Sequence, residues 1–411
     1  MTKPICRFCE TSLEHTFADL GISPLANSYL KPEQLNQMER FYPLHVYVCH
    51  QCMLVQLQEF ETPQDIFSDY AYFSSFSDTF LAHAKSYVEM AIDKFQLTSK
   101  SHVVEVASND GYLLQYFAER GIPVLGIEPA ANVAKVAMEK GITSVVKFFG
   151  TQTARALAAE GRQADFLVGN NVLAHVPQLN DFVAGLNVLL KQTGVITMEF
   201  PHLLRLIGDK LFDTIYHEHF SYFSLHAVSQ VFEKQGLTIF DVEEVTTHGG
   251  SLRIYAQHAG EGGRPVSDRI HELQSRERAA GFQKLDAYLT FGRQMTAAKR
   301  SLLAFLIEAK NSGKVIVGYG APAKGNTLLN YCGVRTDFIE YTVDRSPYKQ
   351  GQFLPGCHIP IMPPEHVRET KPDFLLILAW NLKDEVMEQM AFIRSWGGKF
   401  VVPLPDVKVY P

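Results

Sequence analysis

The side chains best suited to chemistry are concentrated between residues 216 and 222, where the sequence reads Y-H-E-H-F-S-Y. Two imidazoles, a carboxylate and two phenols therefore lie within seven residues. Histidine titrates near neutral pH and can remove a proton from carbon, and a neighbouring carboxylate or phenol can orient it or stabilise the resulting charge. The stretch therefore indicates proton abstraction. The alternative is a cluster of half-buried, hydrogen-bonded polar residues, because isolated histidines are usually structural.

Four cysteines near the N-terminus form two C-x-x-C pairs, and 39 residues separate Cys9 from Cys49. Each pair can grip a metal from a tight turn, and two pairs complete a four-sulfur shell around zinc. Four thiolates leave no open coordination position, so we expect a structural zinc at Cys6, Cys9, Cys49 and Cys52. A redox pair or unliganded thiols are the alternatives, although a redox motif would need only one copy.

Length and composition limit the possible classes of protein. A chain of 411 residues is too long for one ordinary core, so we expect two or three domains. No stretch approaches the ~20 consecutive apolar residues of a membrane span, and no signal peptide is evident, so we expect a cytoplasmic protein without a membrane partner. The net charge of -6 gives no general attraction to nucleic acid, whereas a small anionic ligand can still be held locally.

The elements that must position these residues alternate regularly from residue 101 to 258. Short apolar runs, each followed by a helix-period or loop segment, predict a mostly parallel sheet with ligands at the carboxyl ends of its strands. A pair of β-strands closes this unit. The predicted strands are Val103–Val106, Val124–Ile127, Val145–Phe148, Phe166–Val168, Val195–Phe200, Leu237–Val245 and Ser251–His258.

The turn after the first of these strands has the sequence E-V-A-S-N-D-G, and Glu128 ends the second strand. An acidic residue at that end can accept hydrogen bonds from the ribose hydroxyls of an adenosine-type cofactor. A dinucleotide would need a G-x-G-x-x-G turn, which is missing, and Asp110 would repel an anion there. The turn therefore favours a cationic cofactor without phosphate.

A second α/β unit begins near residue 315, after a charged segment at 264–312 that predicts one bridging helix. Its first strand leads into G-Y-G-A-P-A-K-G-N-T, a glycine-rich turn that opens a helix and carries Lys324. Such a turn suits a phosphate or diphosphate. Close packing of strand and helix explains the glycines equally well.

Together, the four cysteines, the E-V-A-S-N-D-G turn, the Y-H-E-H-F-S-Y stretch and the G-Y-G-A-P-A-K-G-N-T turn resemble one family over essentially the whole chain. This is the family of S-adenosylmethionine-dependent deoxysugar C-methyltransferases, which act on nucleotide-linked (commonly dTDP-linked) 4-keto-6-deoxysugars, often at C3, in deoxysugar and antibiotic biosynthesis. The turn departs from the general methyltransferase motif E/D-x-G-x-G-x-G, because Ala107 and Asn109 replace the first two glycines.

The resemblance implies an α/β fold with three domains. These are a small zinc-binding domain at 1–66, a Rossmann-like methyltransferase domain with a parallel sheet at 67–260, and a Rossmann-like α/β domain at 261–411 that helps to bind the nucleotide-sugar. The oligomeric state does not follow from the sequence, which is compatible with a monomer.

The resemblance also implies site residues. His219 is the expected base, Glu218 its partner, and Tyr216 or His175 the donor to the enolate oxygen, because a C–H group beside a ketone is acidic enough to be deprotonated by a positioned base. The expected cofactor contacts are Tyr70, Glu105, Ala107, Ser108, Asn109, Gly111, Glu128, Pro129, Phe149 and Asn170. The expected substrate contacts are Asn171, His202, Tyr222, His248, Tyr319, Lys324 and Asn326. An O- or N-methyltransferase and a non-catalytic, zinc-stapled nucleotide-binding protein are the alternatives.

Overall fold

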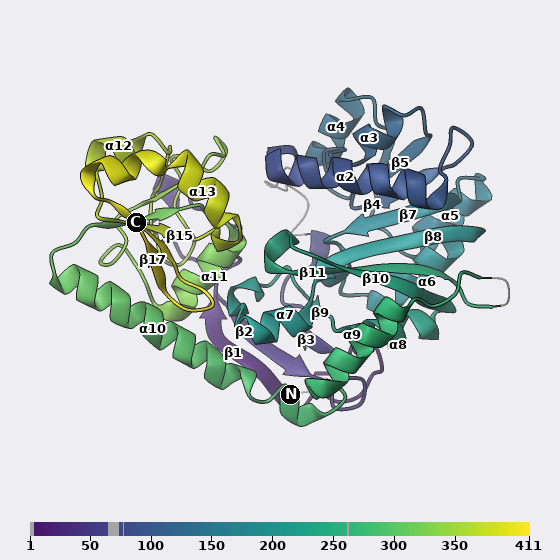
Figure 1. Cartoon of the computed structure of the whole chain (residues 1–411), viewed down its shortest axis with the longest axis horizontal. Coiled ribbons are helices and arrows are strands. Elements are labelled where there is room, and N and C mark those ends of the chain that lie inside the picture. The colour runs from purple at the N-terminus through teal and green to yellow at the C-terminus, as the bar shows by residue number, and fades with distance from the viewer. Residues whose placement is uncertain (1–3, 65–73, 77, 261–262) are drawn as a thin grey trace.

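The computed structural model describes residues 4–64, 74–76, 78–260 and 263–411. Figure 1 shows two α/β bodies side by side, with the strands of a small N-terminal sheet below and between them. The predicted α/β fold class is confirmed by this arrangement of sheets. Among the described residues, no helix is both long enough and apolar enough to cross a membrane.

The N-terminal sheet has four strands in the order β1-β2-β3-β9. Alternating burial along β2 turns Leu44, Val46 and Val48 inward, which is the pattern of a sheet covered on one face. Its last strand comes from the 216–222 stretch, because Ser221 and Tyr222 pair with Gln56 and Val55. The strands are β1 (His15–Ser23), β2 (Tyr42–Val48), β3 (Val55–Leu57) and β9 (Ser221–Tyr222), and η1 (Pro32–Gln34) lies between β1 and β2.

The central sheet has seven strands in the order β10-β11-β8-β7-β4-β5-β6. Strands β8, β7, β4, β5 and β6 are parallel, and β11 and β10 close the sheet in antiparallel fashion, as the sequence predicts. The strands are β4 (Val103–Val106), β5 (Val124–Ile127), β6 (Ser144–Val145), β7 (Ala164–Asn170), β8 (Leu190–Pro201), β10 (Leu237–Val245) and β11 (Ser251–His258).

Helices cover both faces of the central sheet and bury the apolar side chains of its strands. They are α2 (Asp78–Phe95), α3 (Leu114–Ala118), α4 (Ala131–Glu139), α5 (Thr151–Ala159), α6 (Leu179–Leu189) and α8 (Leu225–Lys234). Helix α7 (Leu203–Gly208) instead buries Leu203 and Leu206 in the core shared with the N-terminal and C-terminal sheets. Short 3-10 turns lie at η2 (Ser74–Phe76), η3 (Leu173–His175), η4 (Phe212–Thr214) and η5 (Thr247–Gly249).

The C-terminal sheet has six strands in the order β14-β13-β12-β15-β16-β17, of which only the last runs antiparallel. Its strands are β12 (Ile316–Tyr319), β13 (Thr342–Val343), β14 (Ile361–Met362), β15 (Phe374–Ile377), β16 (Lys399–Val402) and β17 (Lys408–Tyr410). Its helices are α11 (Ala323–Cys332), α12 (His366–Thr370) and α13 (Lys383–Gln389), with η7 (Trp380–Leu382) and η8 (Ala391–Trp396).

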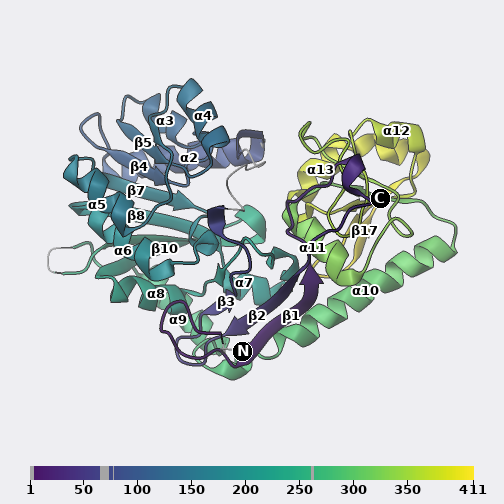
Figure 2. The same ribbon diagram turned by 180° about the vertical axis from the view of Figure 1, so that it is seen from behind.

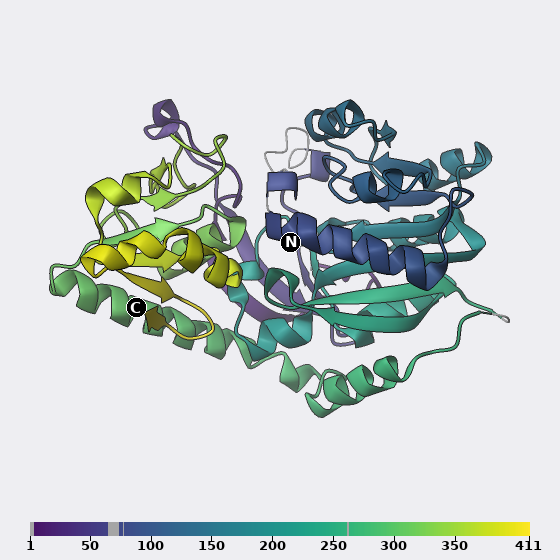
Figure 3. The ribbon, with the colours of Figure 1, turned by 45° about the horizontal axis from the view of Figure 1, so that its top comes forward.

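The single bridging helix predicted for 264–312 is wrong. The segment forms α9 (Asp268–Ala279), η6 (Leu285–Ala287) and α10 (Phe291–Asn311), with the break after Gly281, whose φ of 81° ends the first helix. Figure 3 shows α10 passing beneath the C-terminal sheet while α9 stays under the central one.

Three segments pack against a part of the molecule other than the domain that the sequence predicts for them. Strand β9 completes the N-terminal sheet, and α9 packs on α8 and β10 of the central body. The segment between β1 and β2 leaves the N-terminal sheet, and Leu30 forms a β-bridge with Phe353 of the C-terminal body. These contacts cross the predicted boundaries between residues 1–66, 67–260 and 261–411, and the three-domain division stays a prediction.

Candidate active site

The turn after β4 keeps the backbone of a glycine motif although two of its glycines are replaced. Ala107, Asn109 and Gly111 all have left-handed backbones, with φ of 56°, 50° and 77°. Asparagine tolerates this region better than most residues, whereas alanine adopts it only under strain. A side chain at Gly111 would meet Ile142 Cγ1 at 3.1 Å. All three glycine positions of the motif therefore have the positive φ that glycine adopts most readily.

Three carboxyl groups surround this turn. Burial raises the pKa of Glu105 well above its usual range, and the neighbouring charges of Glu128 and Asp110 raise it further, against a small opposite effect from the Tyr112 hydroxyl. Burial also raises the pKa of Glu128, although two backbone amides oppose the shift. A region that penalises negative charge in this way favours a cationic ligand, because the cation stabilises both ionised carboxylates.

The carboxylate of Glu128 also holds the turn itself. It accepts hydrogen bonds from the backbone amides of Asn109 and Ala130, each at 2.9 Å. Pro129 follows directly, ahead of α4. Each oxygen retains a second lone pair, so these bonds leave room for ribose hydroxyls.

Asp110 has a charged partner in the structure. Its side chain forms an ion pair with Lys140 at 3.2 Å, and Lys140 Nζ also donates to its backbone carbonyl at 2.9 Å. The charge of Asp110 still acts on buried Glu105. The missing phosphate motif, Asp110 and the buried glutamates together favour a cation at this turn.

Two further polar side chains lie at the carboxyl ends of neighbouring strands, Ser108 after β4 and Asn170 at the end of β7. Ser108 Oγ and Asn170 Oδ1 are buried and have no hydrogen-bond partner among the described residues. Buried polar atoms of this kind need a partner, so they mark a place for a polar ligand. Phe149 packs edge-on against Phe182 beside them, with ring centroids 5.2 Å apart. Tyr70 lies outside the described residues.

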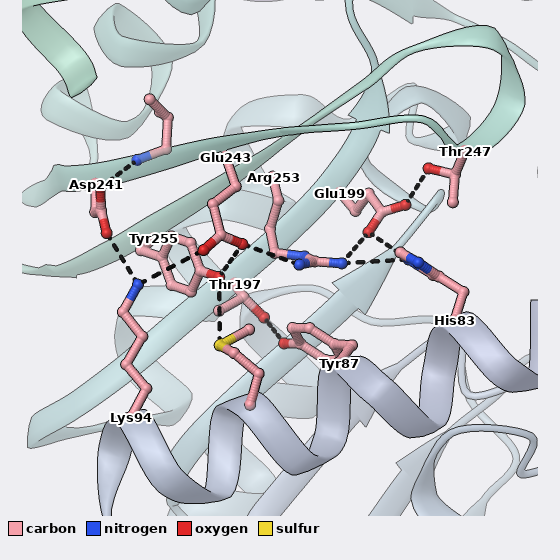
Figure 4. A network of polar contacts seen from close by, with 12 residues as sticks. His83, Tyr87, Lys94, Thr197, Glu199, Asp241, Glu243, Thr247, Arg253 and Tyr255 are labelled. Atoms are coloured by element: carbon pink, nitrogen blue, oxygen red, sulfur yellow. Dashed lines mark hydrogen bonds and ion pairs between the residues drawn. The ribbon is translucent and has the colours of Figure 1, made fainter.

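Figure 4 shows a polar network that fastens α2 to β8, β10 and β11. The sequence does not reveal this network. Glu199 on β8 receives hydrogen bonds from Arg253 at 2.7 Å and from Thr247 at 2.6 Å, and it pairs with His83 at 3.3 Å. Burial alone would raise the pKa of Glu199, but His83 and Arg253 outweigh it and lower the pKa to about 2. The backbone carbonyl of Glu199 also accepts from the amide of Asn171 at 2.7 Å, so this network supports the loop after β7.

The 216–222 stretch forms a turn that brings its reactive rings together beside the loop after β7. The amide of His219 donates to the carbonyl of Tyr216 at 2.9 Å, and their rings lie 4.1 Å apart. The His219 ring also meets the His175 ring edge-on at 4.6 Å. The amide of Phe220 donates to the carbonyl of Ala174 at 2.7 Å and fixes the stretch to the loop after β7. The four predicted catalytic residues therefore lie at one place.

Hydrogen bonds define the state of both imidazoles. His219 Nδ1 lies 2.9 Å from the carbonyl of Thr214, which can only accept, so Nδ1 carries the proton and Nε2 the lone pair. Burial lowers the pKa of His175 to about 4, against a hydrogen bond to the backbone carbonyl of Glu218. His175 is therefore neutral near pH 7, and that carbonyl uses its one N–H group. His217 turns away and donates to the carbonyl of Pro43 at 3.3 Å.

The predicted substrate residues are spread over three places. Tyr319, Lys324 and Asn326 surround the turn after β12, where Tyr319 donates to Gln389 at 2.8 Å. Tyr222 is buried beside His219, with ring centroids 6.1 Å apart. His202 is only 1% exposed and pairs with buried Glu277 at 2.8 Å, an arrangement that serves packing of α8 and α9. The side chain of His248, in η5, lies outside the described part of the structure.

Lys324 belongs to a buried cluster between the central and C-terminal bodies. Its Nζ lies 5.1 Å from the centre of the Trp380 ring, and Trp380 donates its indole N–H to Asp213. Burial lowers the pKa of Lys324, and the charge of Asp213 opposes that shift. Burial raises the pKa of Asp213 to about 6 although Lys324 lowers it. The amide nitrogen of Asn326 is buried there without a partner among the described residues.

The four cysteine sulfurs form one cluster, with three Sγ–Sγ distances of 3.5 to 3.6 Å and all four atoms within 4.8 Å of one another. Tetrahedral zinc with Zn–S bonds of about 2.3 Å would place sulfurs roughly 3.8 Å apart. Both knuckles close alike, because the amides of Glu10 and Met53, each with positive φ, donate to the first cysteine's carbonyl at 2.9 Å. Hydrogen bonds from Cys49 and Cys52 lower the pKa of Cys6, and hydrogen bonds with Cys49 and Cys6 raise that of Cys52, because the sulfurs lie close enough to share protons.

Comparison with known proteins agrees with this geometry. Three family models match the chain, described as a putative zinc binding domain (6–67), a methyltransferase domain (80–242) and a C-methyltransferase C-terminal domain (246–405). The C-methyltransferase NovU of Streptomyces niveus is 33% identical over 411 residues, which cover 100% of this chain and 98% of NovU. The chain belongs to this C-methyltransferase family. As an S-adenosylmethionine-dependent C-methyltransferase, the enzyme uses that cofactor and a structural zinc ion.

Solved structures also resemble part of the C-methyltransferase. The magnesium protoporphyrin IX methyltransferase of Synechocystis with bound SAH is 16% identical and has a TM-score of 0.34, covering 44% of this chain and 83% of that one. An S-adenosylmethionine-dependent methyltransferase of Clostridium acetobutylicum is 10% identical with a TM-score of 0.35, covering 44% of this chain and 92% of that one.

Several residues of the C-methyltransferase site escape prediction from the sequence. Thr214 and Asn27 contact the 216–222 stretch, and the charge of Asp213 acts on Lys324, but none of them belongs to a recognisable motif. Thr214 and Asp213 lie two and three residues before Tyr216, and this closeness in the sequence is the one signal that could have identified them. Asn27 lies 191 residues away from Glu218 in the chain and gave no signal.

Proposed function

We propose that the enzyme transfers a methyl group to the carbon beside the ketone of a nucleotide-linked 4-keto-6-deoxysugar, most directly C3, through an enolate. The observation that carries the proposal is the fixed position of His219, with Nδ1 bonded to the Thr214 carbonyl and its ring against Tyr216 and His175. A base held in one tautomer beside a phenol suits removal of a proton from carbon. Transfer to oxygen or nitrogen needs only a mild base and no donor for an enolate oxygen.

The cofactor supplies an electrophilic methyl group when it is bound. Glu128 would hold its ribose hydroxyls, and the left-handed turn at Ala107, Asn109 and Gly111 lets a ligand approach the backbone. Ser108 and Asn170 offer buried oxygens to its polar groups. The two glutamates with raised pKa favour its positive charge.

His219 is the proposed base, because its Nε2 carries the lone pair in the tautomer that Thr214 selects. Tyr216 is the better donor to the enolate oxygen. His175 is neutral and spends its single N–H group on the Glu218 carbonyl, so it has no proton to offer while that bond holds. One well-placed donor of this type contributes roughly 3 kcal/mol to the transition state.

Lys324 and the start of α11 would receive the diphosphate of the substrate. The helix begins at the glycine-rich turn, and the buried amide of Asn326 lies on its first turn. Asp213 reduces the net positive charge there, so backbone amides must contribute to binding. The sugar would then extend from this turn toward Tyr216 and His219, with Asn171 and Tyr222 beside it.

The test is incubation of the enzyme with nucleotide-linked 4-keto-6-deoxysugars and methyl-labelled S-adenosylmethionine. We expect a product heavier by one methyl group, and two-dimensional NMR should show the label bonded to ring carbon. Label on oxygen or nitrogen would contradict the proposal and favour an O- or N-methyltransferase. Tight nucleotide-sugar binding with no transfer would favour a non-catalytic binding protein.

A further inference from the structure

The chain that joins β1 to β2 runs between the catalytic stretch and the C-terminal body. Figure 2 shows it leaving the upper end of β1 and passing beside the C-terminal sheet. Leu30 and Phe353 exchange two backbone hydrogen bonds, of 3.0 and 2.8 Å, and the hydroxyl of Tyr29 donates to the carbonyl of Ala321 at 2.6 Å. A segment of the zinc-binding part of the chain is thus anchored at the glycine-rich turn.

Asn27, in the same segment, contacts the catalytic stretch directly. Its Nδ2 donates to Oε1 of Glu218 at 2.6 Å. A carboxylate only accepts, so the amide must present its NH2 group to Glu218 and its oxygen to the other side. That oxygen lies 3.2 Å from the hydroxyl of Tyr29, whose single proton is also directed to the closer carbonyl of Ala321 at 2.6 Å, so the two acceptors share one donor.

The contact matters because Glu218 connects the two histidines. Its backbone carbonyl accepts the hydrogen bond from His175, and the next residue is His219. Glu218 itself is buried. A carboxylate in such a place needs charge-assisted hydrogen bonds to stay ionised and in one orientation.

We infer that Asn27 is a positioning residue of the active site, which holds Glu218 and through it the turn that carries His219. The inference rests on the proposed function only for the role of Glu218, because the contact itself is present in the protein without substrate. It also gives the zinc-binding part of the chain a direct part in catalysis. Tyr29, two residues further along the same segment, fastens this segment to the C-terminal body through Ala321 and lies beside the amide oxygen of Asn27.

The substitution Asn27→Asp tests the inference most sharply, since it keeps size and shape but replaces the donor with a second carboxylate. Asn187→Asp is the matched control. Asn187 donates from α6 to the carbonyl of Gln235 at 3.0 Å and lies outside the site, so the control loses a similar hydrogen bond and gains the same charge. Asn27→Ala removes the donor without adding charge.

We expect Asn27→Asp to lower kcat by about 30-fold and Asn27→Ala by about 10-fold, while KM for the nucleotide-sugar and Kd for S-adenosylmethionine change by less than about threefold. Tyr29→Phe should lower kcat by about threefold. In a Glu218→Ala background, Asn27→Ala should have no further effect on kcat, because it acts only through Glu218. Additive losses in that double variant, or wild-type kcat in Asn27→Asp, would overturn the inference.

Melting temperature gives a reading that needs no substrate. Asn27→Asp should lower Tm, and Asn27→Asp with Glu218→Gln should recover it, since the amide and carboxylate then exchange places. Asn187→Asp with Glu218→Gln should show no such recovery. If no nucleotide-sugar is methylated, the proposed function fails. The Tm values of the single and double variants still decide whether Asn27 is the partner of Glu218. Equal Tm losses with and without Glu218→Gln would reject Asn27 as its partner.

Discussion

The turns that follow β4 and β12 are built alike but differ in charge. In each sheet the neighbouring parallel strand ends in an acidic residue that accepts two backbone amides. Glu128 accepts from Asn109 in the turn and from Ala130, and Asp344 accepts from Ala321 in the turn, at 2.7 Å, and from Ser346, at 2.9 Å. The same backbone design therefore serves both α/β bodies.

The difference lies in what surrounds each acid. Glu128 faces buried Glu105, whose pKa is raised, so the first turn gains from a cation. Asp344 lies 3.6 Å from Lys349, and Lys324 stands at the start of the adjoining helix, so the second turn can accept an anion. Under the proposed function, one backbone geometry would serve two ligands of opposite charge, the cofactor at the first turn and the diphosphate at the second.

Removal of zinc should lower turnover strongly while leaving cofactor binding at the turn after β4 largely intact. Strand β9, at the end of the 216–222 stretch, pairs with β3, and Gln56 of β3 donates to Cys6 Sγ at 3.1 Å. Loss of the metal should therefore disturb the 216–222 stretch. We expect Cys49→Ser or chelation to lower turnover by about 100-fold or more, with S-adenosylmethionine binding largely kept in the central body. Elemental analysis should give about one zinc per chain in the active protein. Chelated enzyme with full turnover would contradict this expectation.

The acid of the first turn should matter for the cofactor alone. Glu128→Ala removes charge-assisted hydrogen bonds to two hydroxyls and should weaken S-adenosylmethionine binding by about 1.5 to 3 kcal/mol. Calorimetry should show unchanged affinity for the nucleoside diphosphate. Asp344→Ala is the matched variant in the other turn and should leave the cofactor's affinity unchanged. Equal effects of both variants on the cofactor would show that the turns are not specialised.

The lysine of the second turn should matter for the nucleotide alone. Lys324→Met, combined with Asp213→Asn so that no unpaired charge stays buried, should weaken nucleoside diphosphate binding by about tenfold. The Kd for S-adenosylmethionine should not change. Asp213→Asn alone is the control and should bind the nucleotide at least as tightly as the wild type. A tenfold loss in that control would show that the packing of Trp380 matters more than the charge.

Affinity for the cofactor should depend on pH in one direction. Glu105 and Glu128 both have raised pKa values, chiefly through burial, so they take up protons before ordinary carboxyl groups do as the pH falls. Each protonation removes a charge that attracts the cation. Affinity should therefore fall severalfold between about pH 8 and the usual carboxyl pKa of 4.5, less steeply in Glu128→Gln. Affinity that rises on acidification would contradict the first turn's preference.

Local patterns in the sequence predict most of the fold and the identity of the reactive groups. Short apolar strands, the paired cysteines and the Y-H-E-H-F-S-Y stretch act over a few residues, so they can be read without knowledge of the tertiary structure. Bridging segments are harder, because a break such as the one at Gly281 depends on which body each half packs against.

Contacts between distant parts of the chain could not be predicted. Asn27 and Glu218 meet only because the segment between β1 and β2 crosses to the C-terminal body, and no periodicity encodes that crossing. The ion pair of Asp110 could not be predicted either, because its partner, Lys140, lies 30 residues away in the chain. His202 is a residue type that often contacts ligands, and the sequence gave no sign of its ion pair with Glu277 of α9.

The most direct test of the account is hydrogen exchange at the carbon beside the substrate ketone. Wild-type enzyme with the nucleotide-linked 4-keto-6-deoxysugar, in deuterated water and with S-adenosylhomocysteine in place of the methyl donor, should incorporate deuterium at that carbon. His219→Asn should lose this exchange and lower turnover by about 10² to 10⁴, with Kd for the cofactor and Tm close to wild type. A well-folded His219→Asn enzyme that exchanges and turns over like the wild type would contradict the assignment of His219 as the base.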